Sequence, residues 1–315
     1  METLIPQHLN AGDVVGIVAP AGPITEKQAE QCAEKVKAAG FTPLLADGIC
    51  KKFGYLAGTD VERASQLNKM FNNKNVKAII CARGGYGTSR ILDYLDYDLI
   101  KENPKILGGY SDITALSLAV YKKTQLVTFH SSMLVPQATK YTEDSMWQIF
   151  QHGKKGFIIS CEYEPPQNDY VYSQKPTVLK SGKCRGTLIG GNLTLLETLI
   201  GTKYENIFKN KILFIEEVNE PPYKIDRMLT HLRNSINFSG IKGIIFGKMK
   251  GCEAQDKDSL PLDYVIDEFC LRADVPTIKY FSFGHVSSRC TFPIGVKVEM
   301  DTNELTVKLL EDCVD

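Results

Sequence analysis

The segment 106–116, with the sequence ILGGYSDITAL, places a serine where nucleophilic chemistry is possible. An apolar stretch runs into two glycines, Ser111 comes shortly after them, and a helix-forming sequence begins directly beyond it. Such a turn exposes a serine hydroxyl at the carboxyl end of a strand. Backbone N–H groups at the start of the next helix, with that of Asp112 first, can stabilise an oxyanion. The pair Ser-Asp is also a common helix cap. This segment alone therefore leaves two interpretations of Ser111, a nucleophile and a structural cap.

A catalytic serine needs a base, and His285 has the most suitable surroundings of the five histidines. It lies in YFSFGHVSSRCTFPIG, where a glycine precedes it and a loop follows, which suits an imidazole that projects from a strand end into a cleft. The alternative is an ordinary histidine on a surface loop. The other four lie near the amino terminus, at a strand end or in polar and helical surroundings: His8, His130, His152 and His231.

Two adjacent carboxylates, Glu216 and Glu217, stand in the apolar segment KILFIEEVNEPPY. Burying a carboxylate is costly unless it is paired or used. Because successive strand residues point to opposite faces, only one of the two can reach a given imidazole, and the alternation does not choose between them. An acid that orients the base completes a Ser-Glu-His arrangement. The alternative is a structural ion pair with Arg227 or Lys224.

The glycine-rich loop ARGGYGTSR, residues 82–90, is a second candidate for binding. Glycine turns between a strand and a helix cradle phosphate groups, and Arg83 and Arg90 are available to assist. The loop lacks both the GxxxxGK[ST] spacing and the full GxGxxG, so it only weakly indicates a nucleotide. The same glycines equally offer a backbone N–H to an oxyanion.

The elements that must position these residues alternate in type through the first half of the chain. Apolar β-branched runs predict strands at 13–20, 41–46, 76–82, 105–107 and 126–129. Helices are predicted at 25–40, from Thr59 onward with Val61, Ala64, Leu67 and Phe71 facing inward, at 88–95 and at 113–122. This alternation is typical of a parallel sheet with helices on both faces. We therefore predict an α/β fold with an N-terminal Rossmann- or flavodoxin-like domain.

The chain is predicted to divide where its composition changes. Residues 153–183 are polar and contain prolines, with one strand-like piece at 170–172, and they form a connecting segment between residues 1–152 and 184–315. The first part carries Ser111, and the last is a smaller mixed α/β domain that carries the glutamates and His285. In that domain we predict helices at 193–200 and 225–232, strands at 211–218 and 241–246, and a closing hairpin of 296–300 and 305–309.

The composition describes an ordinary globular protein, since 43% of the residues are apolar and 23% are charged. Thirty-seven basic residues balance thirty-seven acidic ones, so no overall field attracts nucleic acid or an anionic membrane surface, and a small-molecule partner is expected. The nine cysteines form no CxxC pair, which argues against a zinc knuckle and suits a reducing compartment. No signal peptide or membrane span is evident, so we expect a cytoplasmic protein.

Taken together, these segments resemble the LD-carboxypeptidase family, the muramoyltetrapeptide carboxypeptidases of bacterial cell-wall recycling, over nearly the whole chain. The stretches that carry the resemblance are VGIVAPAGPI, GYLAGTDVERASQL, ARGGYGTSRILDYLD, GYSDITAL, GTLIGGNLTLLETLIGT, FIEEVNEPPYKIDRML and FGHVSSRCTFPIG. The resemblance implies that Ser111 is the nucleophile of a serine hydrolase and that His285 is its base. It also implies that the acid is Glu216 rather than Glu217.

Further site residues follow from the same resemblance. The oxyanion donors are expected to be the backbone N–H groups of Asp112 and Gly85. Tyr86 and Asn192, the latter in GGNL, are expected to face the substrate, with packing of their loops as the alternative. The reaction implied needs no metal and no cofactor. Family members are often dimers, so a homodimer is expected.

The resemblance implies cleavage of the bond that releases terminal D-alanine from cytoplasmic murein tetrapeptides. The family also includes immunity proteins that hydrolyse peptide-nucleotide antibiotics related to microcin C. The resemblance implies that those immunity proteins have extra tryptophans in a longer substrate loop. This chain has only Trp147, so the cell-wall substrate is favoured. Ser131-Ser132 stand where relatives often have Gly-Pro, a departure that concerns a nearby pocket wall. The sequence is also compatible with a nucleotide-binding enzyme that uses the glycine loop and with a catalytically silent peptidoglycan-binding protein.

Overall fold

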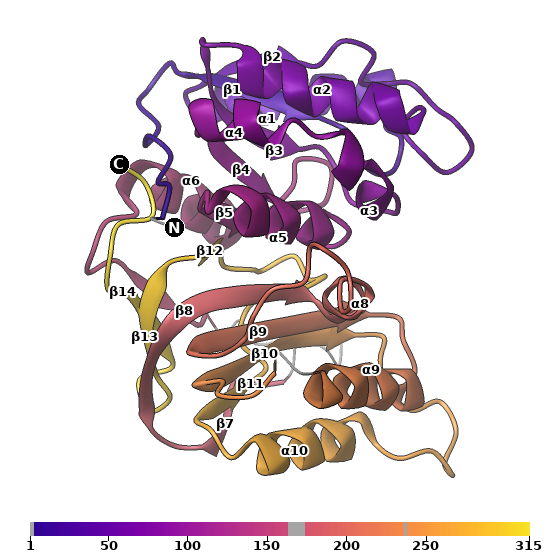
Figure 1. Ribbon diagram of the computed structural model, residues 1–315, viewed down its shortest axis with the longest axis vertical. Helices are drawn as coiled ribbons and strands as arrows, with labels where there is room; N and C mark the ends of the chain where they lie inside the picture. The colour runs from indigo at the N-terminus through magenta and orange to yellow at the C-terminus, as the bar shows by residue number, and fades with distance from the viewer. Residues whose placement is uncertain (1–2, 163–173, 236–237) are drawn as a thin grey trace.

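The computed structural model describes residues 3–162, 174–235 and 238–315, and its strands form two sheets stacked along the long axis of the molecule (Figure 1). The strand-like piece predicted at 170–172 lies outside the described residues. Nearly all of the first sheet comes from the first half of the chain, and the second sheet comes mostly from the second half. The predicted α/β fold class is confirmed.

The first sheet has the strand order β12-β5-β4-β3-β1-β2. Its strands are β1 (Val14–Val18), β2 (Thr42–Leu45), β3 (Val76–Cys81), β4 (Ile106–Gly109), β5 (Thr128–His130) and β12 (Phe292–Ile294). The strands β1 to β5 are parallel to their neighbours, and β12 is antiparallel to β5. The order 2-1-3-4-5 is the flavodoxin-like one, in which ligands bind at the carboxyl ends of the strands near the β1/β3 switch point. The loops after β1, β3 and β4 therefore lie where a site is expected.

Helices cover both faces of this sheet. They are α1 (Glu26–Ala38), α2 (Asp60–Asn72), α3 (Thr88–Ile91), the 3₁₀ turn η1 (Leu92–Tyr94), α4 (Tyr97–Glu102), α5 (Ile113–Thr124) and α6 (Lys140–His152). Thr25 and Thr59 cap α1 and α2 with complete capping boxes, as Ser/Thr followed by Gln/Glu predicts. The prediction that Val61 faces inward is wrong, because Val61 lies in the first turn of α2 and is 61% exposed. No element was predicted over α6.

The second sheet has the order β6-β14-β13-β8-β9-β10-β11-β7 and is mixed. Its strands are β6 (Ile158–Ser160), β7 (Thr177–Lys180), β8 (Lys183–Asn192), β9 (Lys211–Val218), β10 (Gly243–Lys250), β11 (Thr277–Lys279), β13 (Lys297–Asp301) and β14 (Thr306–Leu309). Its helices are α8 (Leu193–Thr198), α9 (Pro222–Asn234) and α10 (Leu262–Ala273). The strands β8 to β11 are parallel, and the predicted closing hairpin is β13 paired with β14.

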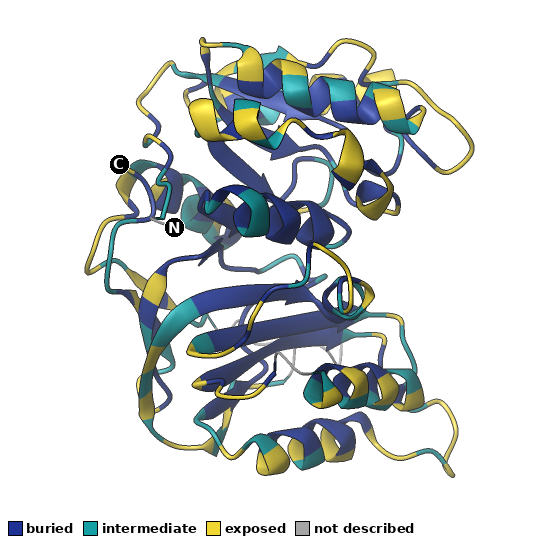
Figure 2. Ribbon diagram, viewed as in Figure 1, coloured by how far each residue is buried: buried dark blue, intermediate teal, exposed yellow. Residues whose placement is uncertain are grey.

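Helix α5 joins the two sheets. It contacts β4 and β5 of the first sheet and β8 and α8 on the other side, and it is buried along almost its whole length (Figure 2). A helix that is apolar on all sides is one that is covered on all sides. At its first turn, a Cβ on Gly191 of β8 would come within 2.4 Å of the Thr114 side chain, so only glycine permits this approach. The Thr114 hydroxyl also accepts a hydrogen bond from the backbone N–H of Asn192 at 3.1 Å.

All nine cysteines are free thiols. Within the described residues, no helix combines the length and the apolar character needed to cross a bilayer.

Candidate active site

Ser111 lies in a strained turn between β4 and α5. Its φ of 63° places a non-glycine residue in the left-handed region, which is costly and occurs preferentially at functional sites. Gly109 precedes the turn because a Cβ there would come within 2.9 Å of the Ile113 side chain. The helix α5 has no side-chain cap, and the Ser111 hydroxyl is directed to another partner. The structure therefore rejects the interpretation of Ser111 as a helix cap.

That partner is His285, and a continuous hydrogen-bonded chain runs through it. The His285 Nε2 lies 2.9 Å from the Ser111 Oγ, and its Nδ1 lies 2.7 Å from Glu216 Oε2. Ser111 comes from the first sheet, while Glu216 belongs to β9 of the second. His285 follows Gly284, whose φ of 117° and close approach to the Lys248 carbonyl require glycine. The three predicted residues thus meet between the two sheets.

The electrostatics of the pair suit a base held by an acid. The Glu216 side chain is fully buried and that of His285 is 19% exposed. Burial alone would lower the pKa of His285, but the charge and hydrogen bond of Glu216, together with the charge of Glu217, outweigh burial and raise it. Burial likewise opposes ionisation of Glu216, and the His285 imidazole holds its pKa below the usual range. The two shifts agree with each other and describe an ionised carboxylate beside an imidazole that binds protons more readily than usual.

The neighbouring Glu217 faces the other side of β9. Its carboxylate accepts hydrogen bonds at 2.7 Å from the Asn192 amide and from both the N–H and the hydroxyl of Thr194, at the start of α8. Lys224, one of the cations considered as its partner, pairs with Glu220 instead. The geometry therefore selects Glu216 as the partner of the histidine, a choice that strand alternation left open.

The glycine loop, which is predicted to supply the second oxyanion donor, lies against Ser111. A Cβ on Gly84 would come within 3.0 Å of Ser111 Oγ, and the Gly84 carbonyl accepts a hydrogen bond from Gly22 N–H at 3.1 Å. Gly85, the predicted donor, follows with a φ of 127°. The two arginines considered as phosphate ligands both have protein partners. Arg83 donates to the Pro23 carbonyl at 3.4 Å, and Arg90 pairs with Asp60 at 2.9 Å.

The sequence of this chain is similar to those of known proteins over most of its length. Residues 15–131 match the family profile described as the LD-carboxypeptidase N-terminal domain, and residues 185–300 match that of the LD-carboxypeptidase C-terminal domain. The chain is 38% identical over 307 residues to the probable murein peptide carboxypeptidase of Bacillus subtilis, covering 96% of this chain and 92% of the relative. The chain belongs to the LD-carboxypeptidase family. Membership indicates a serine carboxypeptidase.

Immunity proteins of the same family are also similar to this chain. The microcin C7 self-immunity protein MccF of Escherichia coli is 28% identical over 331 residues, which cover 98% of this chain and 96% of the relative. The crystal structure of an MccF-like protein from Bacillus anthracis matches with a TM-score of 0.87 at 30% identity, covering 98% of this chain and 100% of that one. This chain therefore shares the fold of the MccF-like protein.

A buried arginine, Arg289, lies beside this hydrogen-bonded chain and was not predicted from the sequence. The Arg289 guanidinium lies 4.8 Å from the centroid of the Tyr110 ring, and that ring lies 5.1 Å from the His285 ring. Arg289 also donates to the Ser132 hydroxyl at 2.9 Å. Ser132 belongs to the Ser131-Ser132 pair noted in the sequence, and its hydroxyl accepts this hydrogen bond from the cation. Arg289 stands four residues after His285 in the motif FGHVSSRCTFPIG, and this proximity in sequence could have indicated that it lies near the site.

A second histidine, His130, also lies near the chain of Ser111, His285 and Glu216, and the sequence did not favour it as the base. Its ring contacts Phe214 at 5.2 Å and Tyr110 at 6.1 Å between centroids. Burial lowers the pKa of His130 to about 4, even though the Glu216 charge opposes that shift. His130 is therefore neutral near pH 7, and its pKa is shifted in the opposite direction to that of His285.

The two residues predicted to face the substrate differ in exposure. Tyr86 is 52% exposed and packs edge-on against Tyr55, with ring centroids 5.7 Å apart, so its ring is open to a ligand. Asn192 is buried; its amide donates to Glu217, and its oxygen caps α8 by accepting from Leu195 N–H at 3.3 Å. These contacts fit the packing alternative, and a substrate-facing role for Asn192 stays a prediction.

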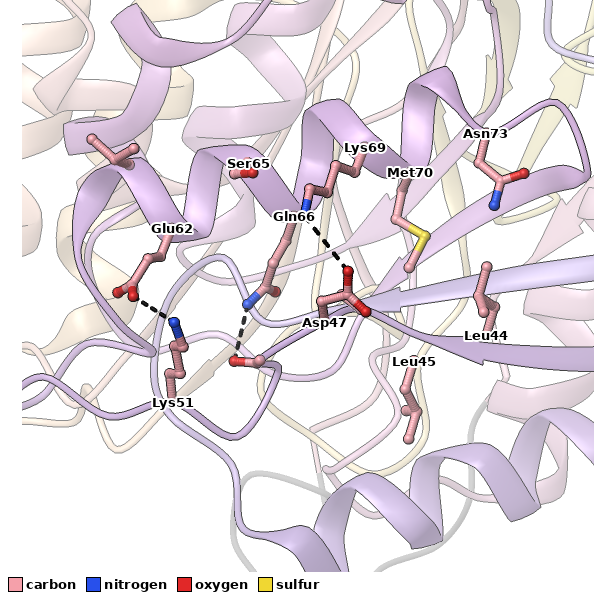
Figure 3. A pocket seen from close by; sticks show the side chains of 13 residues that line it. Leu44, Leu45, Asp47, Lys51, Glu62, Ser65, Gln66, Lys69, Met70 and Asn73 are labelled. Carbon is pink, nitrogen blue, oxygen red and sulfur yellow. Dashed lines mark hydrogen bonds and ion pairs between the residues drawn. The ribbon is translucent and has the colours of Figure 1, made fainter.

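A cavity of about 450 Å³ lies elsewhere, between β2 and α2 (Figure 3). Its charged lining residues pair with one another, Lys51 with Glu62 at 2.6 Å and Lys69 with Asp47 at 3.5 Å. The lining spans residues 44–73 and includes no member of the hydrogen-bonded chain at Ser111. This cavity is therefore separate from the hydrogen-bonded chain between the two sheets.

Proposed function

We propose that this chain is a serine LD-carboxypeptidase that removes terminal D-alanine from murein tetrapeptides, with Ser111 as nucleophile. The observation that carries the proposal is the chain of hydrogen bonds from Ser111 through His285 to Glu216, at 2.9 and 2.7 Å. A hydroxyl, an imidazole and a carboxylate in this order form the arrangement that activates a serine. The similarity to the probable murein peptide carboxypeptidase of Bacillus subtilis supports the substrate class.

In the proposed reaction, His285 Nε2 accepts the Ser111 proton while the serine oxygen attacks the carbonyl carbon before D-alanine. Glu216 accepts a hydrogen bond from Nδ1–H, fixes the imidazole and stabilises its positive charge. The N–H groups of Asp112 and Gly85 hold the oxyanion. Collapse of the tetrahedral species breaks the C–N bond, and His285 returns the proton to the departing amine of D-alanine. Water then attacks the acyl-enzyme by the same steps and restores Ser111.

The test compares the purified protein with Ser111→Ala on tetrapeptides that contain L-lysine or diaminopimelate, with D-alanine followed by mass spectrometry. Wild type should release D-alanine with and without a chelator, and Ser111→Ala should lose on the order of 10³-fold or more in rate, by analogy with the loss of a triad member. No release by wild type would overturn the carboxypeptidase proposal. Loss of release on adding the chelator would overturn the metal-free mechanism.

A second candidate function is hydrolysis of peptide-nucleotide conjugates of the microcin C type. The observation in its favour is the similarity to MccF and to the MccF-like structure. A peptide-nucleotide conjugate offered in the same assay decides between the two. A higher kcat/KM for the conjugate than for the tetrapeptide would favour the immunity function.

We further propose that Tyr86 contacts the substrate. Its exposed ring belongs to the glycine loop that touches Ser111, and the Tyr55 ring packs against it. Tyr86→Ala should raise KM several-fold with a smaller change in kcat, because a contact made equally in ground and transition states affects binding alone. Tyr94→Ala, at a tyrosine of equal 52% exposure, is the matched control and should leave KM unchanged.

The cytoplasmic location and the homodimer remain part of the proposal. Cell fractionation tests the first, and light scattering of the purified protein tests the second.

A further inference from the structure

Asp112, the residue after the proposed nucleophile, has a side chain that serves another loop. It is buried at 3% exposure, and it makes no capping hydrogen bond to its own helix α5. Its Oδ2 accepts a hydrogen bond from the backbone N–H of Thr88 at 2.8 Å, and the Thr88 hydroxyl donates to the Asp112 carbonyl. Two hydrogen bonds therefore join the turn at Ser111 to the first residue of α3.

The glycine loop, residues 84–87, directly precedes Thr88. Gly85 and Gly87 have φ angles of 127° and 124°, which few other residues adopt, so the loop is built from positions with wide conformational freedom. At its other end, Gly84 touches Ser111. An oxyanion donor is effective only when its N–H is oriented before charge develops. A loop this rich in glycine therefore needs an anchor at each end.

A buried arginine, Arg63, also holds the same loop. Arg63 is fully buried, and its guanidinium donates to the Gly87 carbonyl at 2.9 Å and to the Pro20 carbonyl. Asp60 pairs with Arg63 at 2.5 Å and with Arg90 at 2.9 Å, which compensates the buried charge. The loops after β1 and β3 are thus tied together next to the turn that follows β4.

We propose that Asp112 is a positioning residue that couples the two oxyanion donors. Its backbone N–H is one donor, and its carboxylate fixes the loop that supplies the other. Arg63 supports that loop through its hydrogen bond to the Gly87 carbonyl. The inference rests on the proposed function for the reaction itself, and it adds the side-chain contacts that keep the donors in place.

The kinetic test uses Asp112→Ala, which keeps the backbone N–H and Ser111 but removes the carboxylate. The kcat for D-alanine release should fall on the order of 10²-fold, as for a lost oxyanion donor, while KM stays within about threefold. Asp112→Asn keeps an oxygen that accepts from Thr88 N–H and should recover most of the loss. The matched control is Thr124→Val at the far end of α5, which loses a buried hydroxyl bond to the Val120 carbonyl and should keep its kcat.

A second measurement follows the labelling of Ser111 by a fluorophosphonate, in which the serine oxygen bonds phosphorus and fluoride leaves. Labelling needs the same nucleophile and oxyanion donors but no peptide, so it separates this inference from the choice of substrate. Asp112→Ala should label at least about tenfold more slowly than Thr124→Val. Equal labelling and equal kcat in the two variants would overturn the inference.

Two further outcomes are distinguishable. If Asp112→Ala does not fold, Thr88→Val removes only the hydroxyl bond and should slow labelling several-fold, and a wild-type rate would contradict the inference. If wild type labels at Ser111 but releases no D-alanine, the proposed substrate is wrong, and the labelling ratio still decides the role of Asp112.

Discussion

At the level of single residues, Glu216 and Glu217 are neighbours in the chain with different surroundings. Glu216 faces His285 and is ionised beside it, while Glu217 is held by Asn192 and Thr194. Burial, together with the nearby Glu216 charge, raises the pKa of Glu217. One carboxylate therefore belongs to the proposed chemistry and the other to the junction of β9 with α8.

The pH dependence of the reaction should depend on the interaction between His285 and Glu216. His285 must be neutral to accept the Ser111 proton, and its pKa is raised above the ordinary 6.5. The value of kcat/KM should therefore fall as the pH drops through this raised pKa, with the acidic limb above pH 6.5. Glu216→Gln removes the charge that raises the pKa and leaves the burial that lowers it. Its acidic limb should move to lower pH, and its kcat should fall on the order of 10²–10⁴-fold.

A pH–rate profile of both proteins checks this expectation. An acidic limb at the same pH in wild type and Glu216→Gln would contradict the assignment of Glu216 as the partner of His285.

Glu217→Gln is the matched comparison, because it makes the same chemical change one residue away. It should lower the free energy of unfolding by about 1–3 kcal/mol and leave kcat within about threefold, since one of the two oxygens that accept from Asn192 and Thr194 becomes an NH2 donor. Denaturant unfolding and steady-state kinetics measure the two effects. A kcat loss comparable to that of Glu216→Gln would mean that the roles of the two acids are misassigned.

At the level of elements, the site depends on how closely the loops after parallel strands approach one another. The loop after β3 touches the turn after β4 through Gly84, and β8 touches the start of α5 through Gly191. Glycine is required at both positions because a Cβ would overlap a neighbouring side chain.

Gly84→Ala tests the first of these contacts. Its Cβ would lie 2.9 Å from the Ser111 Cβ and 3.0 Å from the Oγ, so the serine or the loop must shift. We expect kcat to fall at least about tenfold, because displacement of reacting groups by a fraction of an ångström to about 1 Å is costly. The control is Gly201→Ala, which has no atom within 4 Å of the added Cβ and should affect stability alone. An unchanged kcat in Gly84→Ala would show that a Cβ at this position does not displace Ser111, which would contradict the prediction.

At the level of the whole molecule, α5 makes the two sheets one structure. Its buried residues pack against β4 and β5 on one side and against β8 and α8 on the other. The return of β12 to pair with β5 adds a second connection between the two halves. Separating the sheets would expose an apolar helix and break the hydrogen bond between Ser111 and His285.

Unfolding should therefore be one cooperative transition despite the length of 315 residues. Trp147, on α6 near Phe41 at 4.9 Å between ring centroids, reports on the first sheet by fluorescence, and far-ultraviolet circular dichroism reports on both. The two midpoints in denaturant should coincide. Two separated transitions would contradict the view that α5 couples the sheets.

Much of this arrangement was predictable from local sequence. Alternating apolar runs and capping residues predicted β1 to β5, β9 and the caps of α1 and α2, because those features depend on neighbours in the chain. The helices α6 and α10 were missed, and Val61 was placed on the wrong face, because a weak periodicity does not say which side meets the sheet.

The sequence by itself determined that Ser111 stands in a strand-to-helix turn and that two glutamates lie in one buried strand. Its motifs, through their resemblance to a family, pointed to Glu216 and His285. Only the tertiary structure decided the rest. Both faces of β9 are buried, so the choice between its glutamates depends on which face meets His285, 69 residues away in the chain. The carboxylate of Asp112 likewise finds its partner 24 residues away, across a contact between two loops that local sequence does not encode.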